Sequence, residues 1–233
     1  MLAVTGRSPW LRWIVIAALA LVALLVAANV TIYPALTRDP QFPIYIAILG
    51  VAVAIYLALA LWWTGLSALA PALRWGTLCG LGAGLGWLIE IVAGNLASGQ
   101  AWQLLAYFGG TLIALGLTLA AGIAGAMTAR SFRGGLVAGV WCGVVSGLTG
   151  CLALLALPHL FPDILQRDAQ TLAEFARSGA PDLVTYIAGD YSAAAINHLV
   201  IGLLLGLLLG ALGAAIGAGA ARSTPRQPAV SPP

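Results

Sequence analysis

The sequence contains no lysine and has few charged residues of any kind. Charged side chains make up 7% of the 233 residues, whereas hydrophobic residues make up 61%. Because a soluble domain carries roughly 25% charged residues, this composition excludes a soluble fold. The ten basic residues are all arginines, and the formal net charge is only +3. Without a basic surface stripe, the chain is not expected to bind nucleic acid.

Cysteine and histidine are equally scarce. The three cysteines, Cys79, Cys142 and Cys151, all lie in apolar runs, with no CxxC pair and no histidine at ligand spacing. This pattern predicts neither a disulfide framework nor a metal site. Nothing else in the sequence calls for a cofactor, so none is expected.

Long apolar runs dominate what is present. A helix of about 20 apolar residues crosses a bilayer, and only helices satisfy their own backbone along such a run in hydrocarbon. Six segments qualify, at about 13–32, 44–63, 75–96, 102–128, 135–157 and 193–220. We therefore expect an all-α, polytopic transmembrane helix bundle of six spans over residues 1–221. The first apolar run exceeds the roughly 7–15 residues of a signal peptide, so we expect it to remain uncleaved.

The arginines predict the orientation of the bundle. Seven of them would fall on the side that carries both termini, and Arg38, Arg167 and Arg177 would fall on the other side. We expect the protein to lie in the cytoplasmic membrane of the cell. Because cytoplasmic loops carry the excess of basic residues, both termini are expected to lie in the cytoplasm. The proline-rich residues 222–233 are expected to form a disordered cytoplasmic tail.

Residues 158–192, between the last two spans, have a pattern of their own. Apolar residues recur there at helical spacing between Pro162 and Gly179, with charged residues around them. This predicts an amphipathic helix in an extracytoplasmic loop. It is read either as a connector resting on the membrane interface or as a lid or docking element for a partner.

Glycine recurs every four positions in several spans. Small residues at this spacing let two helix backbones approach closely, as in a glycine zipper. The predicted helix-packing residues are Gly76, Gly80, Gly84, Gly86, Gly135, Gly139, Gly143, Gly202, Gly206 and Gly210. We expect spans three, five and six to form the centre of the bundle. The same motif also occurs in interfaces with a second copy or with another membrane protein.

Glu90 is the only formally charged side chain inside the six predicted spans. Four-residue steps along the helix from Glu90 reach glycines, so its carboxyl should project from a face that packs against another helix. Several polar residues lie at a comparable depth, or slightly higher, in the other spans. The candidate ligand-binding residues are Glu90, Asn95, Tyr107, Thr149, Asn197 and His198. Together they predict an outward-facing polar pocket around Glu90.

The sequence leaves two functions open. In the first, the pocket binds a solute or a proton, in a transporter or in a membrane subunit of a larger assembly. In the second, Glu90 only packs, and the glycine helices assemble with a partner or a second copy in the bilayer. No catalytic residues are predicted, because Ser146 lies at mid-depth and His198 higher, so a nucleophile and a base would not meet.

Overall fold

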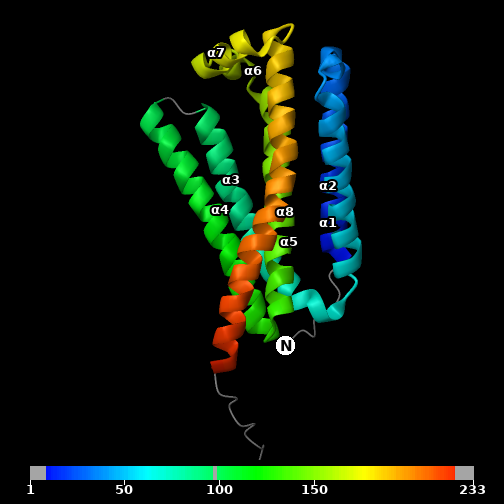
Figure 1. Cartoon of the computed structure of the whole chain (residues 1–233), viewed down its shortest axis with the longest axis vertical. Coiled ribbons are helices and arrows are strands. Elements are labelled where there is room, and N and C mark those ends of the chain that lie inside the picture. Colours follow the sequence, from blue (N-terminus) through cyan, green and yellow to red (C-terminus); the bar gives the residue numbers. More distant parts are fainter. Residues whose placement is uncertain (1–8, 97–98, 224–233) are drawn as a thin grey trace, which may run out of the picture.

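The computed structural model describes residues 9–96 and 99–223. Within these ranges the chain is helical, with no strand, as the composition predicted (Figure 1). The α-helices are α1 (Pro9–Ile32), α2 (Phe42–Trp63), α3 (Ala70–Leu96), α4 (Gln100–Ala129), α5 (Phe132–Leu160), α6 (Pro162–Leu165), α7 (Ala169–Ser178) and α8 (Leu183–Ser223). Two 3-10 helices, η1 (Pro34–Arg38) and η2 (Ser67–Leu69), precede α2 and α3.

Six of these helices, α1 to α5 and α8, are long and apolar enough to span a membrane. The prediction of six spans is therefore confirmed, and the chain is a multi-pass membrane protein. The largest difference from the expected bounds is at α8, which begins at Leu183 rather than at 193 and has 41 residues. The tail predicted at 222–233 lies outside the described residues from position 224 on.

The early start of α8 has a local cause in Asp182. The Asp182 carboxylate accepts hydrogen bonds from both the backbone N–H and the hydroxyl of Thr185, each at 2.8 Å. A side-chain oxygen that accepts a hydrogen bond from a backbone N–H of the first turn favours the start of a helix. Residues 183–192, which were expected to lie in the loop, therefore form the first turns of α8.

The helix predicted between the last two spans is split into α6 and α7. Asp168 interrupts it, because its carboxylate accepts a hydrogen bond from the backbone N–H of Thr171 at 2.7 Å and begins a new helix there. α7 ends at Gly179, whose φ of +72° lies in the left-handed region that favours glycine. α7 has no buried residue, so it rests on the bundle rather than inside it.

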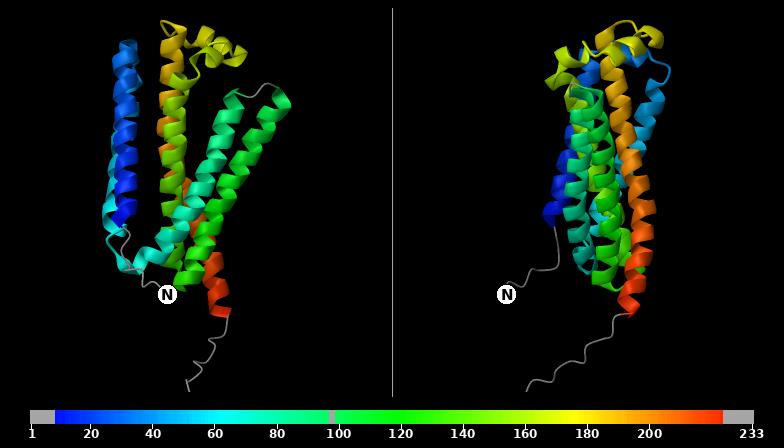
Figure 2. Two further views of the ribbon diagram at one scale, coloured as in Figure 1. Left: turned by 180° about the vertical axis from the view of Figure 1, so that it is seen from behind. Right: turned by 90° about the vertical axis from the view of Figure 1, so that its left-hand side faces the viewer.

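The bundle has two distinct ends. η1, α6, α7, the end of α3 and the start of α4 lie at one end, which we call the α7 end, at the top of Figure 1. The start of α1 and the end of α8 lie at the other end, which we call the terminal end. α5 lies between the α1–α2 hairpin and the α3–α4 hairpin, and it packs against α1, α3, α4 and α8. Figure 2 shows that α3 and α4 lean away from α5 toward the α7 end.

Close backbone contacts at glycine hold the central helices together. A Cβ atom added at any of the predicted helix-packing glycines would come within 3.0 Å of an atom in a neighbouring helix. Gly139 and Gly143 of α5 face Gly210 and Gly202 of α8, and the α3 glycines at 76, 80 and 84 face α5. Gly86 instead faces α4, at the carbonyl oxygen of Gly110.

α4 also belongs to the central helices, although only spans three, five and six were expected there. Its buried residues are all small, and six of them are spaced four apart, at Ala106, Gly110, Ala114, Thr118, Gly122 and Ala126. This face packs against α3 near Gly110 and against α5 and α8 near Gly122. The sequence contains this four-residue spacing, but it is harder to recognise than the glycine spacings because alanine and threonine occupy four of the six positions.

α1 and α2 pack against the central helices through buried apolar residues and a few polar contacts. The hydroxyl of Tyr56, a residue fully buried on α2, donates a hydrogen bond to the carbonyl oxygen of Leu199 on α8 at 3.0 Å. Gly147 and Gly202 leave space for this hydroxyl between α5 and α8. The hairpin is thus fixed near its middle, while its end near η1 borders two hollows.

Candidate functional site

A pocket of about 590 Å³ opens at the α7 end, and we call it the polar pocket. One wall comes from η1 and the start of α2, and the other from the α7–α8 turn and the first turns of α8. Its polar and charged lining residues are Arg38, Asp39, Gln41, Tyr45, Ser178, Thr185, Tyr186 and Asp190. Ligand pockets in proteins commonly measure about 300–1,000 Å³, so a small solute fits here.

The sequence shapes both walls through short turns. Pro34 starts η1, and Asp39 ends it by accepting a hydrogen bond from the backbone N–H of Gln41 at 2.7 Å. The hydroxyl of Tyr45 donates to the Gln41 side chain at 3.1 Å, which fixes this wall. On the other wall, hydrogen bonds from Thr185, chiefly from its backbone N–H, hold the pKa of the Asp182 carboxyl below its ordinary value.

Charges of both signs line the polar pocket without pairing. Arg38, Asp39 and Asp190 belong to its lining, and none of them forms an ion pair within the described ranges. The hydroxyl of Tyr186 donates to a third carboxylate, that of Glu174 on α7, at 3.3 Å. The pocket therefore offers one guanidinium, several carboxylate oxygens and two phenol rings to a ligand.

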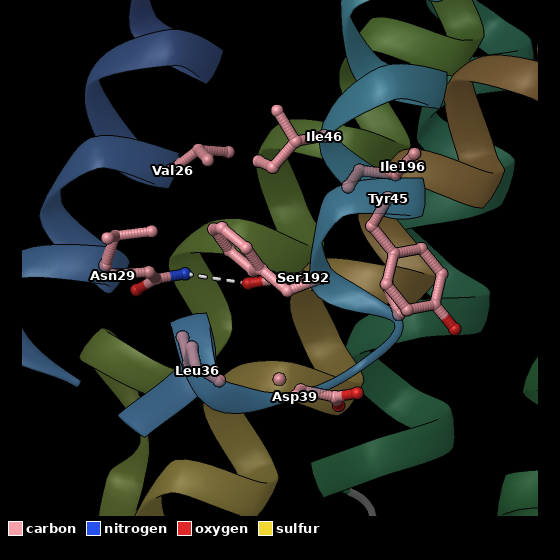
Figure 3. Close-up of a pocket in the computed structure, with 12 residues that line it drawn as sticks. Val26, Asn29, Leu36, Asp39, Tyr45, Ile46, Ser192 and Ile196 are labelled. Carbon is pink, nitrogen blue, oxygen red and sulfur yellow. Dashed lines mark hydrogen bonds between the residues drawn. The ribbon is translucent and has the colours of Figure 1, made fainter. Parts of the chain in front are cut away.

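A smaller cavity of about 50 Å³ lies against the polar pocket, between α1, α2 and α8 (Figure 3). We call it the apolar cavity, because most of its lining is aliphatic or aromatic. The lining residues are Val26, Asn29, Val30, Leu36, Asp39, Phe42, Tyr45, Ile46, Gly189, Ser192, Ala193 and Ile196. In Figure 3 the side chains of Val26 and Ile46 project toward each other across it.

Two lining residues of the apolar cavity, Asn29 and Ser192, belong to a hydrogen-bonded chain of three side chains. The amide nitrogen of Asn29 donates to the hydroxyl of Ser192 at 3.0 Å, as Figure 3 shows. The Asn29 carbonyl oxygen lies 2.7 Å from Nε2 of His159 on α5. Asn29 is only 2% exposed, so these bonds satisfy a polar group that lipid or a dry core would leave unpaired. The chain ties α1, α5 and α8 together.

Glu90 lies at the contact between α3 and α4, not at either hollow. A Cβ atom added to Gly110 would lie 2.9 Å from the Cβ of Glu90, so the two helices touch at this point. One carboxyl oxygen, Oε2, is buried and has no hydrogen-bond partner among the described residues. This contact places the carboxyl at a small-residue face, which is the environment that the glycine spacing predicted.

His198 and Thr149 lie at other helix contacts. The His198 ring meets Trp87 edge to face, with ring centroids 5.4 Å apart, and packs over Gly150. Its Nδ1 lies 3.1 Å from the carbonyl oxygen of Ala194 in its own helix. Thr149 packs against Gly84, and its hydroxyl donates to the carbonyl oxygen of Val145 in α5.

The remaining three candidate residues, Asn95, Tyr107 and Asn197, have different surroundings from Glu90, His198 and Thr149. The Asn95 carbonyl oxygen accepts a hydrogen bond from the Tyr191 hydroxyl at 2.6 Å, which joins α3 to α8. Tyr107 is 51% exposed and stacks edge to face with Phe108, and Asn197 is also exposed. None of the six residues proposed from the sequence lines either hollow. Their joint role as a binding site stays a prediction.

Several residues at the two hollows were not singled out from the sequence. Asn29 was the only buried amide of α1, and a lone amide inside an apolar run is the signal that could have identified it. Arg38 and Asp39 were used only to predict the orientation of the bundle. They were not proposed as site residues, because a 3-10 helix as short as η1 leaves no periodic pattern in the sequence. Within the described residues, no group of three or more His, Cys, Asp or Glu side chains could hold a metal ion.

Comparison with models of protein families, with curated proteins and with solved structures finds no match to this chain.

Proposed function

We propose that this multi-pass membrane protein binds a small polar solute in the polar pocket at its α7 end. The observation that carries the proposal is the unpaired set of charges, Arg38, Asp39 and Asp190, around a hollow of about 590 Å³. Charged side chains that line a concave site without neutralising one another are available to a ligand of complementary charge. Binding would serve either transport of the solute or recognition by a membrane subunit of a complex.

We further propose that the polar pocket faces the outside of the cell. The support is the excess of arginine near the terminal end, which favours cytoplasmic termini in the cytoplasmic membrane. Labelling of single cysteines tests this orientation. In a variant without Cys79, Cys142 and Cys151, Ser178→Cys should react with a membrane-impermeant maleimide in intact cells, and Ser223→Cys should react only after lysis. The reverse pattern would refute the orientation.

Ligand-dependent thermal stability tests the binding proposal. The full chain, held in a detergent-free amphipol, would be heated with panels of amines, amino acids, organic acids and phosphate esters. A solute present at about 100 times its Kd raises the free energy of unfolding by about 2.7 kcal/mol. Asp190→Asn and Arg38→Gln should abolish this gain, whereas Asp163→Asn, an exposed carboxylate of α6 outside the lining, should retain it.

If no solute in these panels stabilises the protein, or if the two lining variants respond as the wild type does, the polar pocket is not a binding site. The protein would then fit the alternative function, in which the helices assemble with a partner or a second copy. A stable partner that co-purifies with the chain, without any ligand response, would support that alternative.

Glu90 supports a second candidate function, binding of a proton or a small cation within the membrane. The observation that favours it is the buried Oε2 atom without a partner, since an unsatisfied polar atom in a bundle is a common sign of a site. Infrared difference spectroscopy of the full chain, with Glu90→Gln as the control, would follow its carboxyl band. A band that does not respond to pH or to added cations would leave Glu90 with a packing role only.

A further inference from the structure

The polar pocket and the apolar cavity adjoin each other. They share five lining residues, Leu36, Asp39, Tyr45, Gly189 and Ala193. The shared residues come from η1 and the residue after it, the start of α2, and the second and third turns of α8, so the same walls bound both spaces. A molecule that fills the polar pocket therefore has the apolar cavity beside it.

The two parts differ in chemistry. Away from the shared walls, the polar pocket is lined by charged and hydroxyl groups, such as those of Arg38, Thr185 and Asp190. Away from the same walls, the apolar cavity is lined mainly by Val26, Ile46 and other apolar side chains. A ligand that matches both parts must itself have a charged portion and a hydrocarbon portion.

The two parts also lie at different depths along the helices. Part of the polar pocket is lined by residues outside the long helices. Arg38 and Asp39 follow the end of α1, and Pro181 precedes the start of α8. Val26 of the apolar cavity lies six residues before the end of α1 at Ile32, roughly 9 Å further into the span. The charged part therefore lies toward the membrane surface and the apolar part toward its interior, which is how an amphiphile is arranged in a bilayer.

The charges define the polar portion of the ligand. The carboxylates of Asp39 and Asp190, with the rings of Tyr45 and Tyr186, suit an ammonium group, which binds both to carboxylates and to aromatic faces. The Arg38 guanidinium suits a phosphate group. Resting on the proposed function, we propose that the ligand is a zwitterionic phospholipid of the bilayer, with its head group in the polar pocket and the start of its chain in the apolar cavity.

Binding of alkylphosphocholines to the full chain tests this proposal. The probes run from glycerophosphocholine, which has the head group without a chain, through ethyl to octyl phosphocholine, each below its micelle concentration. Isothermal titration of the protein in amphipol would give Kd for each probe. Affinity should rise about fourfold for each methylene that enters the apolar cavity and level off where the cavity ends. Alkyl sulfates of the same chain lengths should not bind saturably, because they lack the ammonium group.

A matched pair of variants separates the apolar cavity from general partitioning of alkyl chains. Val26→Phe fills the apolar cavity and should remove the dependence of affinity on chain length, whereas Val51→Phe, at a 62% exposed position of α2 outside both linings, should keep it. Should Val26→Phe fail to fold, the chain-length series in the wild type still decides the question.

The outcomes distinguish the two proposals. If glycerophosphocholine or another head group binds and added methylenes bring no gain, the lipid proposal is overturned while the polar pocket remains a solute site. A gain that persists equally in Val26→Phe also overturns it. If no probe binds and no solute of the earlier panels stabilises the protein, both proposals fail.

Discussion

Gly139 of α5 and Gly210 of α8 meet backbone to backbone at the centre of the bundle. A Cβ atom added to Gly210 would lie 2.8 Å from the Cα of Gly139, and one added to Gly139 would meet the Cα of Gly210 more closely still. Neither atom belongs to a side chain that could turn aside. The separation of α5 and α8 at this level is therefore set by the absence of both side chains.

Gly139→Ala should destabilise the protein for this reason. The added methyl group forces α5 and α8 apart, and overpacking of this kind costs about 1–3 kcal/mol. Gly116→Ala on α4 is the matched control, because a Cβ there has no atom within 4 Å. Thermal unfolding in detergent, followed by circular dichroism, would show the difference. Equal tolerance of the two changes would mean that the glycine contacts do not determine stability.

Replacing Asn29 should weaken the attachment of α1. Asn29→Ala leaves the half-buried side chains of His159 and Ser192 without this partner, at a cost of about 1–3 kcal/mol. Thr31→Ala should change little, since the Thr31 hydroxyl bonds only to carbonyl oxygens of its own helix. The double variant Asn29→Ala/His159→Ala should cost less than the sum of the single changes. Additive losses in unfolding midpoints would show that the two side chains do not act together.

Apolar replacements of Glu90 and Asn95, both on α3, should change the free energy of unfolding in opposite directions. Glu90→Met removes a buried oxygen that has no described partner and should raise the free energy of unfolding by about 1–3 kcal/mol. Asn95→Leu breaks the hydrogen bond from Tyr191 and should lower it by a similar amount. Denaturant titration of both variants would measure this. A loss of stability in Glu90→Met would show that its carboxyl makes a favourable interaction in the membrane.

The start of α8 should depend on pH only in acid. Hydrogen bonds from Thr185 lower the pKa of Asp182, so their contribution is complete above the unfolded value of about 3.9. That contribution is lost as the pH falls through the lower folded-state pKa, and no change is expected between about pH 5 and 8. Amide hydrogen exchange over residues 183–192, corrected for the intrinsic effect of pH, would follow it.

Two variants complete the pH experiment. Asp182→Ala should raise hydrogen exchange in the first turn of α8 at every pH, because the N-cap is gone. Asp163→Ala should leave this segment unchanged, since Asp163 belongs to α6. Protection that changes with pH near neutrality in the wild type would point to a group other than Asp182.

The spans could be predicted from the sequence because hydropathy alone determines which segments enter a bilayer. The prediction of a pocket around Glu90 used only the depth of each residue in the membrane, which was inferred from its position along its own span. Depth does not fix the direction in which a side chain points around the bundle. Glu90 faces α4, His198 faces Trp87 and Thr149 faces Gly84, although all three were placed at one level. These directions follow from how the helices pack, and no periodic pattern records that.

The polar pocket was missed for a related reason. Its walls are a short 3-10 helix and the α7–α8 turn, which come together only after the long helices have packed. The sequence did mark the individual turns, through Pro34, Gly179 and Asp182. It contained no signal that these turns, far apart along the chain, would face each other.

The length of α8 has a mechanical consequence. Its 41 residues span roughly 60 Å, about twice the hydrocarbon thickness of a bilayer. Its first turns form a wall of the polar pocket, its middle presses on α5, and its last turn carries Arg222 at the terminal end. Close glycine contacts from Gly202 to Gly217 hold α8 against α5 and α4. The wall of the polar pocket and the terminal end of α8 therefore belong to one continuous helix that is packed along its length, so the fold joins its two faces through a single element.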